Sequence, residues 1–180
     1  TTQLPGADAI TAEVERRIAL GDRDVVWAYL DLDNFKAFND RVGPARADAV
    51  IRQTGDLVRD VVTRTGAAGD FIGHIAGDDF MMVLDGATAD AVCVAFLQRF
   101  DQLIPLYYDR EDRHRGYIDA QDRYGVDRRF PLMTVSIAAV TLDHMTSFAD
   151  VAAAAATGKA AAKALPTSAY VRDGVVRFPP

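Results

Sequence analysis

Two acidic segments constrain this chain most, and each follows a run of apolar residues. The first reads DLDNFKAFND over residues 31–40, and the second reads HIAGDDF over residues 74–80. A short apolar run that ends in turn-forming residues is typical of a buried strand, so each segment places carboxylates at a strand end. Carboxylates that converge from two adjacent strand ends suit a magnesium–triphosphate site, because Mg²⁺ prefers oxygen ligands and usually takes one or two protein carboxylates.

The remaining sequence predicts alternating helices and strands. Val25–Leu30 is a continuous apolar run, typical of a strand that is buried on both faces, and Gly77-Asp78 indicates a tight hairpin turn. Helices are expected over residues 10–20, 35–40, 45–64, 89–104 and 147–165, and strands over residues 25–30, 71–75, 80–84, 132–142, 169–171 and 175–178. This order predicts an α/β (α+β) fold in which helices cover a mixed sheet. Right-handed crossovers give its centre a ferredoxin-like βαββαβ core.

Bulk properties limit the class of protein. A length of 180 residues predicts a single domain over residues 1–180, large enough to bury a core. No apolar run approaches the roughly 20 residues of a membrane span, so we expect no membrane contact. The net charge of −6 argues against nucleic acid as a partner, but not against a nucleotide whose phosphates a metal screens. Cys93 is the only cysteine; we expect it to be buried, in a reducing, cytoplasmic compartment.

An extended charged insertion is expected at about residues 105–130. Residues 107–130 contain six arginines and six acids, with four tyrosines between them. One interpretation is a solvated β-excursion or long loop that surface ion pairs stabilise weakly. The other is a docking surface, because Tyr and Arg are enriched in protein interfaces.

The two acidic segments together resemble the GGDEF domain, the catalytic module of bacterial diguanylate cyclases. The signature reads AGDDF here, with Ala76 in place of the first glycine and Asp79 in place of the glutamate. Alanine would cost about 1 kcal/mol if that position needs a left-handed backbone, and little if it is extended. The resemblance implies a palm-like fold and a reaction in which two GTP molecules condense to cyclic di-GMP and release pyrophosphate.

The resemblance also implies a metal site. Asp31, the backbone carbonyl of Leu32 and Asp79 would bind Mg²⁺ (or Mn²⁺), although Asp79 reaches one methylene less than glutamate. Asp33 either belongs to this cluster or caps the following helix. Asp78 matches the acid that activates the 3′-hydroxyl, and we count Lys36, expected near the triphosphate, with it as catalytic. The alternative for Asp78 and Asp79 is a polar hairpin tip.

Substrate contacts follow from the same resemblance. Asn39 and Asp48 lie at the family's spacing for guanine, where an amide pairs with the O6/N7 edge and a carboxylate accepts from N1–H and the exocyclic amine. The structural alternatives are helix-end capping for Asn39 and an acid in the first turn of a helix for Asp48. Lys159 and Lys163 are four residues apart, on one helix face, and resemble the basic pair that holds the β- and γ-phosphates. The predicted substrate-binding residues are Asn39, Asp48, Phe35, Lys159 and Lys163.

The leading hypothesis is a GGDEF-type cyclase that works as a two-fold homodimer, with GTP as its partner and an upstream sensory or regulatory domain. Residues 67–70 lack the arginine of the Arg-x-x-Asp product-inhibition site and keep only Asp70, so we expect no feedback binding there. The first alternative is a degenerate, inactive GGDEF module that binds GTP or a protein. A less favoured one is a related palm polymerase that accepts ATP. His74 is expected to serve as a structural hydrogen-bonding group.

Overall fold

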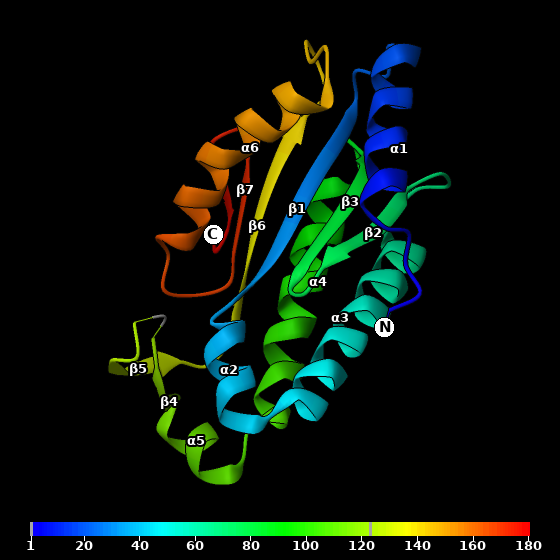
Figure 1. The fold of residues 1–180 in the computed structure, drawn as a ribbon. Helices are drawn as coiled ribbons and strands as arrows, with labels where there is room; N and C mark the ends of the chain where they lie inside the picture. The colour runs from blue at the N-terminus through cyan, green and yellow to red at the C-terminus, as the bar shows by residue number, and fades with distance from the viewer. Residues whose placement is uncertain (1, 123) are drawn as a thin grey trace.

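The computed structural model describes residues 2–122 and 124–180, and it has three layers, with a sheet between two layers of helices (Figure 1). Arg123, which belongs to the predicted insertion, lies outside the described residues. The helices are α1 (Ala7–Leu20), α2 (Phe35–Val42), α3 (Pro44–Thr65), α4 (Ala89–Leu103), α5 (Arg110–Arg115) and α6 (Phe148–Lys163). The strands are β1 (Val25–Asp33), β2 (Phe71–Ala76), β3 (Asp79–Asp85), β4 (Tyr117–Gln121), β5 (Asp127–Pro131), β6 (Thr134–Thr141), β7 (Ala169–Arg172) and β8 (Val175–Phe178).

The main sheet is mixed and confirms the predicted fold class. Within the described ranges its strand order is β2-β3-β1-β6-β7-β8. Strand β1 pairs antiparallel with both β3 and β6, whereas β6 and β7 are parallel and joined through α6. The four strands β2-β3-β1-β6, with α3 and α4 between them in the chain, form the predicted ferredoxin-like core.

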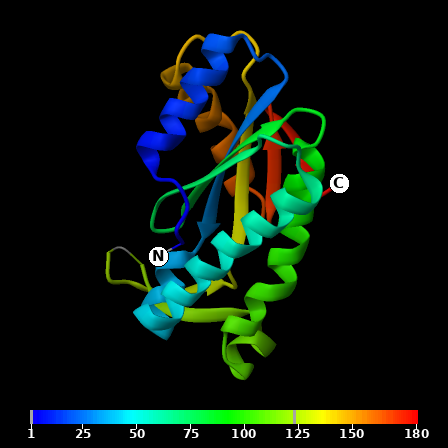
Figure 2. The ribbon, with the colours of Figure 1, turned by 90° about the vertical axis from the view of Figure 1, so that its right-hand side faces the viewer.

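Strand β1 lies at the centre of the sheet, and its side chains alternate between two apolar cores. Leu30 and Leu32 pack in the core under α3 and α4, which cross the same side of the sheet in Figure 2. Trp27 and Tyr29 belong to the opposite core, formed with α1 and α6. Asp31 is two residues after Tyr29, and alternate residues of a strand point to the same face, so its carboxylate faces the α6 side of the sheet.

Strands β1 and β6 differ most in extent from the prediction. Strand β1 continues beyond Leu30 to Asp33, so Asp31 lies inside the ladder rather than after it. Strand β6 begins at Thr134 instead of at residue 132. The reason is that the two preceding amides bond to the insertion: Leu132 N donates to the Gly116 carbonyl at 3.3 Å, and Met133 N to Tyr108 Oη at 2.9 Å.

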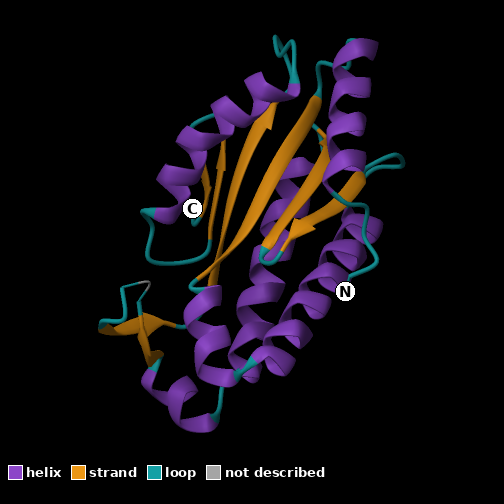
Figure 3. Ribbon diagram, in the orientation of Figure 1, coloured by secondary structure: helices purple, strands orange, loops and turns teal. Residues whose placement is uncertain are grey.

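The described part of the insertion forms an exposed β-hairpin, as the β-excursion interpretation expected, and buried contacts also anchor the insertion to the domain. It contains a short 3₁₀ turn (Ile104–Tyr107), helix α5 and the β4–β5 hairpin, which lies beside α2 and apart from the main sheet (Figure 3). The Asp112 side chain is only 1% exposed and accepts from Arg41 of α2 at 3.1 Å and from Arg115. The Tyr108 ring packs against the Phe38 ring, with centroids 4.8 Å apart. The insertion is therefore fixed to the helix that follows the first acidic segment.

Two smaller predictions hold. Cys93 is fully buried within α4, and the chain around Asp173-Gly174 forms a hairpin between β7 and β8, with both turn residues at positive φ. In the part of the chain that the structure describes, no helix combines the length and apolarity needed to cross a membrane.

Candidate active site

The two acidic segments meet where β1 and β3 pair. Asp31 lies directly opposite Asp79 in the antiparallel register. Side chains that face each other in this way have Cβ atoms roughly 4.5–5.5 Å apart. Lys163 at the end of α6 donates to Asp31 Oδ1 at 2.6 Å and lies 3.4 Å from Asp33. The fold thus brings together two acids from neighbouring strands and a lysine from the last helix.

Asp33 belongs to this cluster and does not cap a helix. Its carboxylate accepts from Ser136 Oγ at 2.8 Å and from Thr134 Oγ1 at 3.1 Å, both on β6. Asn34 is the residue before α2, and its left-handed backbone makes no side-chain cap. Burial raises the pKa of Asp33, although the two hydroxyls and Lys163 oppose the shift. The capping alternative for Asp33 was wrong.

The turn that carries the second segment is built around Gly77. Gly77 has φ = +56°, which an L side chain adopts only at a cost. Ala76 is paired with Asp79 at the end of β2, after a bulge, and lies outside the left-handed region. Alanine in place of the signature's first glycine is therefore cheap here.

His74 fixes the same turn from within β2. Its Nε2 lies 2.9 Å from the Gly77 carbonyl, its Nδ1 lies 3.0 Å from Thr2 Oγ1, and its ring stacks on Phe80. A carbonyl only accepts, so Nε2 carries the proton and donates it. Both ring nitrogens are engaged, which matches the structural position expected for this histidine.

Asp78, at the tip of the turn, is half-buried beside the acidic cluster. Burial is the main cause that raises the pKa of its carboxyl, and the charges of Asp31 and Asp79 add to it while Lys163 opposes them. A carboxylate with a raised pKa is a stronger base, and general bases work best when their pKa approaches the working pH.

Asn39 and Asp48 line one pocket of about 160 Å³ between α2, α3 and the β2–β3 turn. Its wall also includes Phe35, His74, Gly77 and three apolar residues at the start of α3, Pro44, Ala47 and Ile51. Residues predicted to bind guanine from two different helices therefore share one cavity, next to the turn that carries Asp78.

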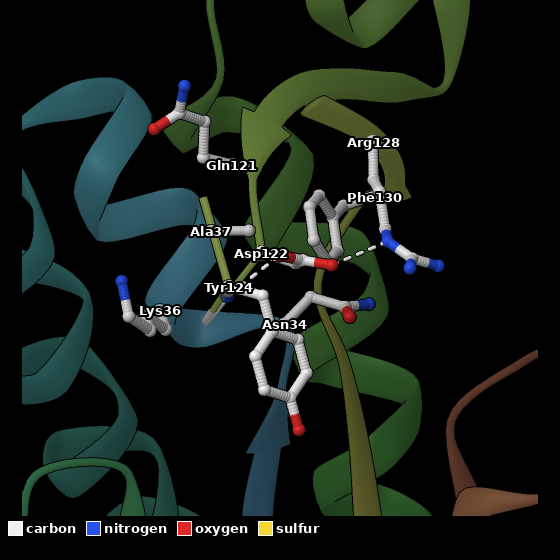
Figure 4. A pocket seen from close by; sticks show the side chains of 8 residues that line it. All are labelled: Asn34, Lys36, Ala37, Gln121, Asp122, Tyr124, Arg128 and Phe130. Atoms are coloured by element: carbon white, nitrogen blue, oxygen red, sulfur yellow. Dashed lines mark hydrogen bonds and ion pairs between the residues drawn. The ribbon is translucent and has the colours of Figure 1, made fainter. Parts of the chain in front are cut away.

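Lys36 lies elsewhere. It lines a separate pocket of about 460 Å³ between α2 and the β4–β5 hairpin, and Figure 4 shows it at the edge of this pocket with its ammonium pointing away from Tyr124 and Arg128. Its ammonium pairs with Asp40, one turn further along α2. The structure does not bring Lys36 into the Asn39–Asp48 pocket, and its catalytic role stays a prediction.

Lys159 and Lys163 both turn toward β1. Lys159 Nζ lies 3.7 Å from the centroid of the Tyr29 ring, a cation–π contact. Burial would lower the pKa of Lys163, but its bonds to Asp31 and Asp33 outweigh burial and raise it, so the ammonium stays charged at neutral pH. The two lysines present positive charge on the same side of β1 as the acids.

Tyr29 was missed as a site residue. Its hydroxyl donates to Asp79 Oδ1, and the Lys159 ammonium lies over the face of its ring. The sequence shows it only as part of an apolar strand. The signal that could have found it is its position two residues before Asp31, because alternate residues of a strand share a face.

The donor set fits the implied metal. Among the described residues, no three His, Cys, Asp or Glu side chains are grouped closely enough to hold an ion as they stand. Asp31 and Asp79 instead engage Lys163 and Tyr29. Even so, two carboxylates on facing strands, next to the carbonyl of Leu32, supply the hard oxygen donors that Mg²⁺ prefers. A carboxylate has about four lone-pair sites, so each acid keeps room for an ion.

The fold and the site together define a ferredoxin-like α/β domain with an acidic cluster at paired strand ends and a small pocket beside it. The family model "Diguanylate cyclase, GGDEF domain" matches residues 1–114, well over half of the chain. The chain belongs to the GGDEF family.

A curated diguanylate cyclase agrees with this assignment. The chain is 30% identical over 122 residues to the diguanylate cyclase DgcP of Escherichia coli, a match that covers 66% of this chain and 33% of that protein. It is 28% identical over 154 residues to the protein y4lL of Sinorhizobium fredii, covering 84% of this chain and 17% of that protein. The chain thus spans a third or less of these relatives.

Solved structures show the same fold. The active GGEEF domain of a diguanylate cyclase from Vibrio cholerae matches with a TM-score of 0.67 and 20% identity, over 90% of this chain and 92% of that one. The GGDEF domain of DgcB from Caulobacter crescentus, in complex with c-di-GMP, matches with a TM-score of 0.66 and 23% identity, over 96% and 92%.

Proposed function

We propose that this domain condenses two GTP molecules into cyclic di-GMP with Mg²⁺, or Mn²⁺ in its place. The observation that carries the proposal is Asp31 facing Asp79 across the β1–β3 pair, with Lys163 bonded to the same cluster. The family assignment supports the same reaction. Here Asp79 supplies the carboxylate that the signature's glutamate supplies elsewhere.

Each residue of the site has a proposed task. Asn39 and Asp48 hold the guanine edge in their shared pocket, and Lys159 and Lys163 hold the β- and γ-phosphates. Asp78 takes the proton of the 3′-hydroxyl as that oxygen bonds to the α-phosphorus of the other GTP and pyrophosphate leaves. A bound Mg²⁺ would neutralise charge on the phosphate oxygens, held by Asp31, Asp79 and the Leu32 carbonyl.

The reaction requires two copies of the domain. Each site holds one GTP, so the two nucleotides react when two domains meet face to face about a two-fold axis. The chain spans only part of its relatives, and we propose that an upstream sensory or regulatory domain of the full protein controls this meeting. GTP as substrate places the reaction in the cytoplasm.

We further propose that cyclic di-GMP does not inhibit the enzyme at residues 67–70. Both oxygens of Asp70 already accept backbone bonds at 2.8 Å, from Ala67 N and Asp85 N. Arg64, the nearest arginine before this loop, pairs with Asp60 at 2.7 Å. The carboxylate thus has a structural role, and no arginine stands at the expected position.

The test is product analysis. The purified domain, dimerised by a fused coiled coil, is incubated with GTP and Mg²⁺, and the products are separated by chromatography. We expect cyclic di-GMP from the wild type, none from Asp79→Ala, and no cyclic dinucleotide when ATP replaces GTP.

The controls make each outcome informative. Arg129→Ala, a change on the exposed hairpin, should leave the product yield unchanged. GTP binding without product from a confirmed dimer would overturn the proposal in favour of an inactive GTP-binding module. Product from ATP would instead indicate a polymerase-like relative.

A further inference from the structure

We propose that Tyr29 is a positioning residue that holds Asp79 in the orientation needed to bind the metal. This inference rests on the proposed function and deepens it, since it assigns the residue that compensates for the short acid of the AGDDF signature. Tyr29 donates its hydroxyl proton to Asp79 Oδ1.

The sheet register explains why a tyrosine can do this. Tyr29 is paired with Met81 across β1–β3, so Asp79 is its diagonal neighbour on the same face. Diagonal neighbours lie roughly 7–8 Å apart, a gap that aromatic and long side chains can span. The phenol thus reaches Asp79 from the strand that carries Asp31.

The bond leaves Asp79 able to bind an ion. Tyr29 occupies one lone-pair site on Oδ1, and the carboxylate keeps its remaining sites, including those of Oδ2. With one oxygen anchored, the side chain loses rotamer freedom before the ion arrives. Mg²⁺ demands near-ideal geometry, so a short carboxylate gains more from such anchoring than a long one that can adjust.

Neighbouring side chains pack on the Tyr29 ring. Its ring is half-buried, lies 6.0 Å from the Trp27 ring and carries Lys159 Nζ at 3.7 Å on its face. The same ring therefore fixes the proposed metal ligand Asp79 at its hydroxyl and the proposed phosphate ligand Lys159 at its face. One side chain thus contacts both halves of the proposed triphosphate site.

The experiment measures metal affinity without turnover. Mn²⁺ is titrated into the domain saturated with 3′-deoxy-GTP, which lacks the attacking hydroxyl, and free Mn²⁺ is followed by electron paramagnetic resonance. We expect Tyr29→Phe to weaken Mn²⁺ binding about 10–100-fold, the usual effect of removing a hydrogen-bond partner of a metal ligand. The matched control Tyr107→Phe loses a hydroxyl bonded to Gln53 at 3.4 Å and should bind Mn²⁺ like the wild type.

A double-mutant cycle separates positioning from mere packing. In an Asp79→Asn background the Tyr29→Phe change should have no further effect on Mn²⁺ affinity, because the two residues act through one bond. An equal loss in both backgrounds would show that Tyr29 acts through the fold and would overturn the inference.

The remaining outcomes distinguish this inference from the proposed function. Wild-type Mn²⁺ affinity in Tyr29→Phe would overturn the inference and leave the proposed function standing. A wild type that binds 3′-deoxy-GTP but no Mn²⁺ would instead overturn the proposed function. Thermal melting of each variant shows whether a loss of affinity comes from unfolding.

Discussion

The active-site cluster and the insertion are both rich in charge, but their charges are arranged differently. In the cluster, Lys163 bonds Asp31 across 132 residues of sequence, and Asp31 is only 14% exposed. In the β4–β5 hairpin, Arg129 lies 3.5 Å from Asp119 on the paired strand, and the two side chains are 71% and 57% exposed. Charge density alone therefore does not distinguish the two regions.

The contrast shows what marks a site in this fold. Local, exposed pairs in water contribute little energy and leave the side chains free. Charged side chains that come from distant segments and meet on one face of the sheet lose much of their water. Each of them therefore needs several hydrogen-bond or ion-pair partners to be stable there. Asp112 is the exception within the insertion, since it is buried between Arg41 and Arg115 and serves as an anchor rather than a site.

Removing one acid of the cluster should have the largest effect. Asp31→Asn keeps the shape of the side chain but deletes the charge that faces Asp79. We expect cyclic di-GMP formation by the dimerised domain to fall at least about a hundredfold, because metal stabilisation of the phosphate charge is worth several kcal/mol. Initial rates by chromatography measure this, and a rate within about threefold of wild type would contradict it.

Removing the anchor of the insertion should affect stability. In Asp112→Ala, Arg41 and Arg115 lose their partner, and we expect the free energy of unfolding to fall by about 2–3 kcal/mol. Urea denaturation at pH 7 measures the loss. An unchanged midpoint would show that the insertion is not anchored through this residue.

The stability that Asp112 contributes to the wild type should depend on pH in a defined way. Burial alone would raise the pKa of Asp112, but the bonds from Arg41 and Arg115 outweigh it and hold the pKa below its ordinary value. The stabilisation is therefore fully present above the ordinary pKa of about 3.9 and is lost as the pH falls through the folded value. The difference in free energy of unfolding between wild type and Asp112→Ala should stay constant from pH 7 to about pH 5 and should become smaller below about pH 4.

Base recognition should show a smaller effect. Asp48→Ala removes the carboxylate proposed to accept from guanine in the pocket shared with Asn39. We expect kcat/KM for GTP to fall about tenfold, because the guanine N1–H and amine lose a charged acceptor worth about 1.5 kcal/mol or more. Steady-state kinetics test this; a wild-type value would place the guanine elsewhere.

The smallest effect belongs to the exposed hairpin. Arg129 lies 3.5 Å from Asp119, and its side chain is 71% exposed. Arg129→Ala should change the free energy of unfolding by less than about 0.5 kcal/mol, as expected for a surface pair. Urea denaturation beside Asp112→Ala provides the comparison, and a loss above 1 kcal/mol would show that the hairpin is not a surface element.

Much of the fold could be predicted because its signals are local. The apolar run before Asp31, the Gly77 turn and the spacing of the helices each depend on neighbouring residues. Their order then leaves few topologies, since crossovers are right-handed and strand partners are usually close in sequence. The ends of strands were less predictable, because Leu132 bonds to Gly116 of the insertion rather than to β1.

The site was predictable only as a set of positions. The motif spacing identified Asn39 and Asp48, which the fold brings into one pocket. It could not show that Asp33 bonds to Ser136, about a hundred residues further on, or that Tyr29 reaches Asp79. Those contacts depend on strand register, and no local pattern encodes which side chains become neighbours across a sheet.

The most direct test asks which of the two charged regions binds the nucleotide. The domain is titrated with 3′-deoxy-GTP and Mg²⁺ by calorimetry in three forms: wild type, Lys163→Met and Arg128→Met. We expect Lys163→Met to weaken binding about tenfold or more, as loss of a charged contact does, and Arg128→Met to bind like the wild type. Weaker binding in Arg128→Met, with Lys163→Met unchanged, would place the nucleotide in the pocket of Figure 4 and contradict this account.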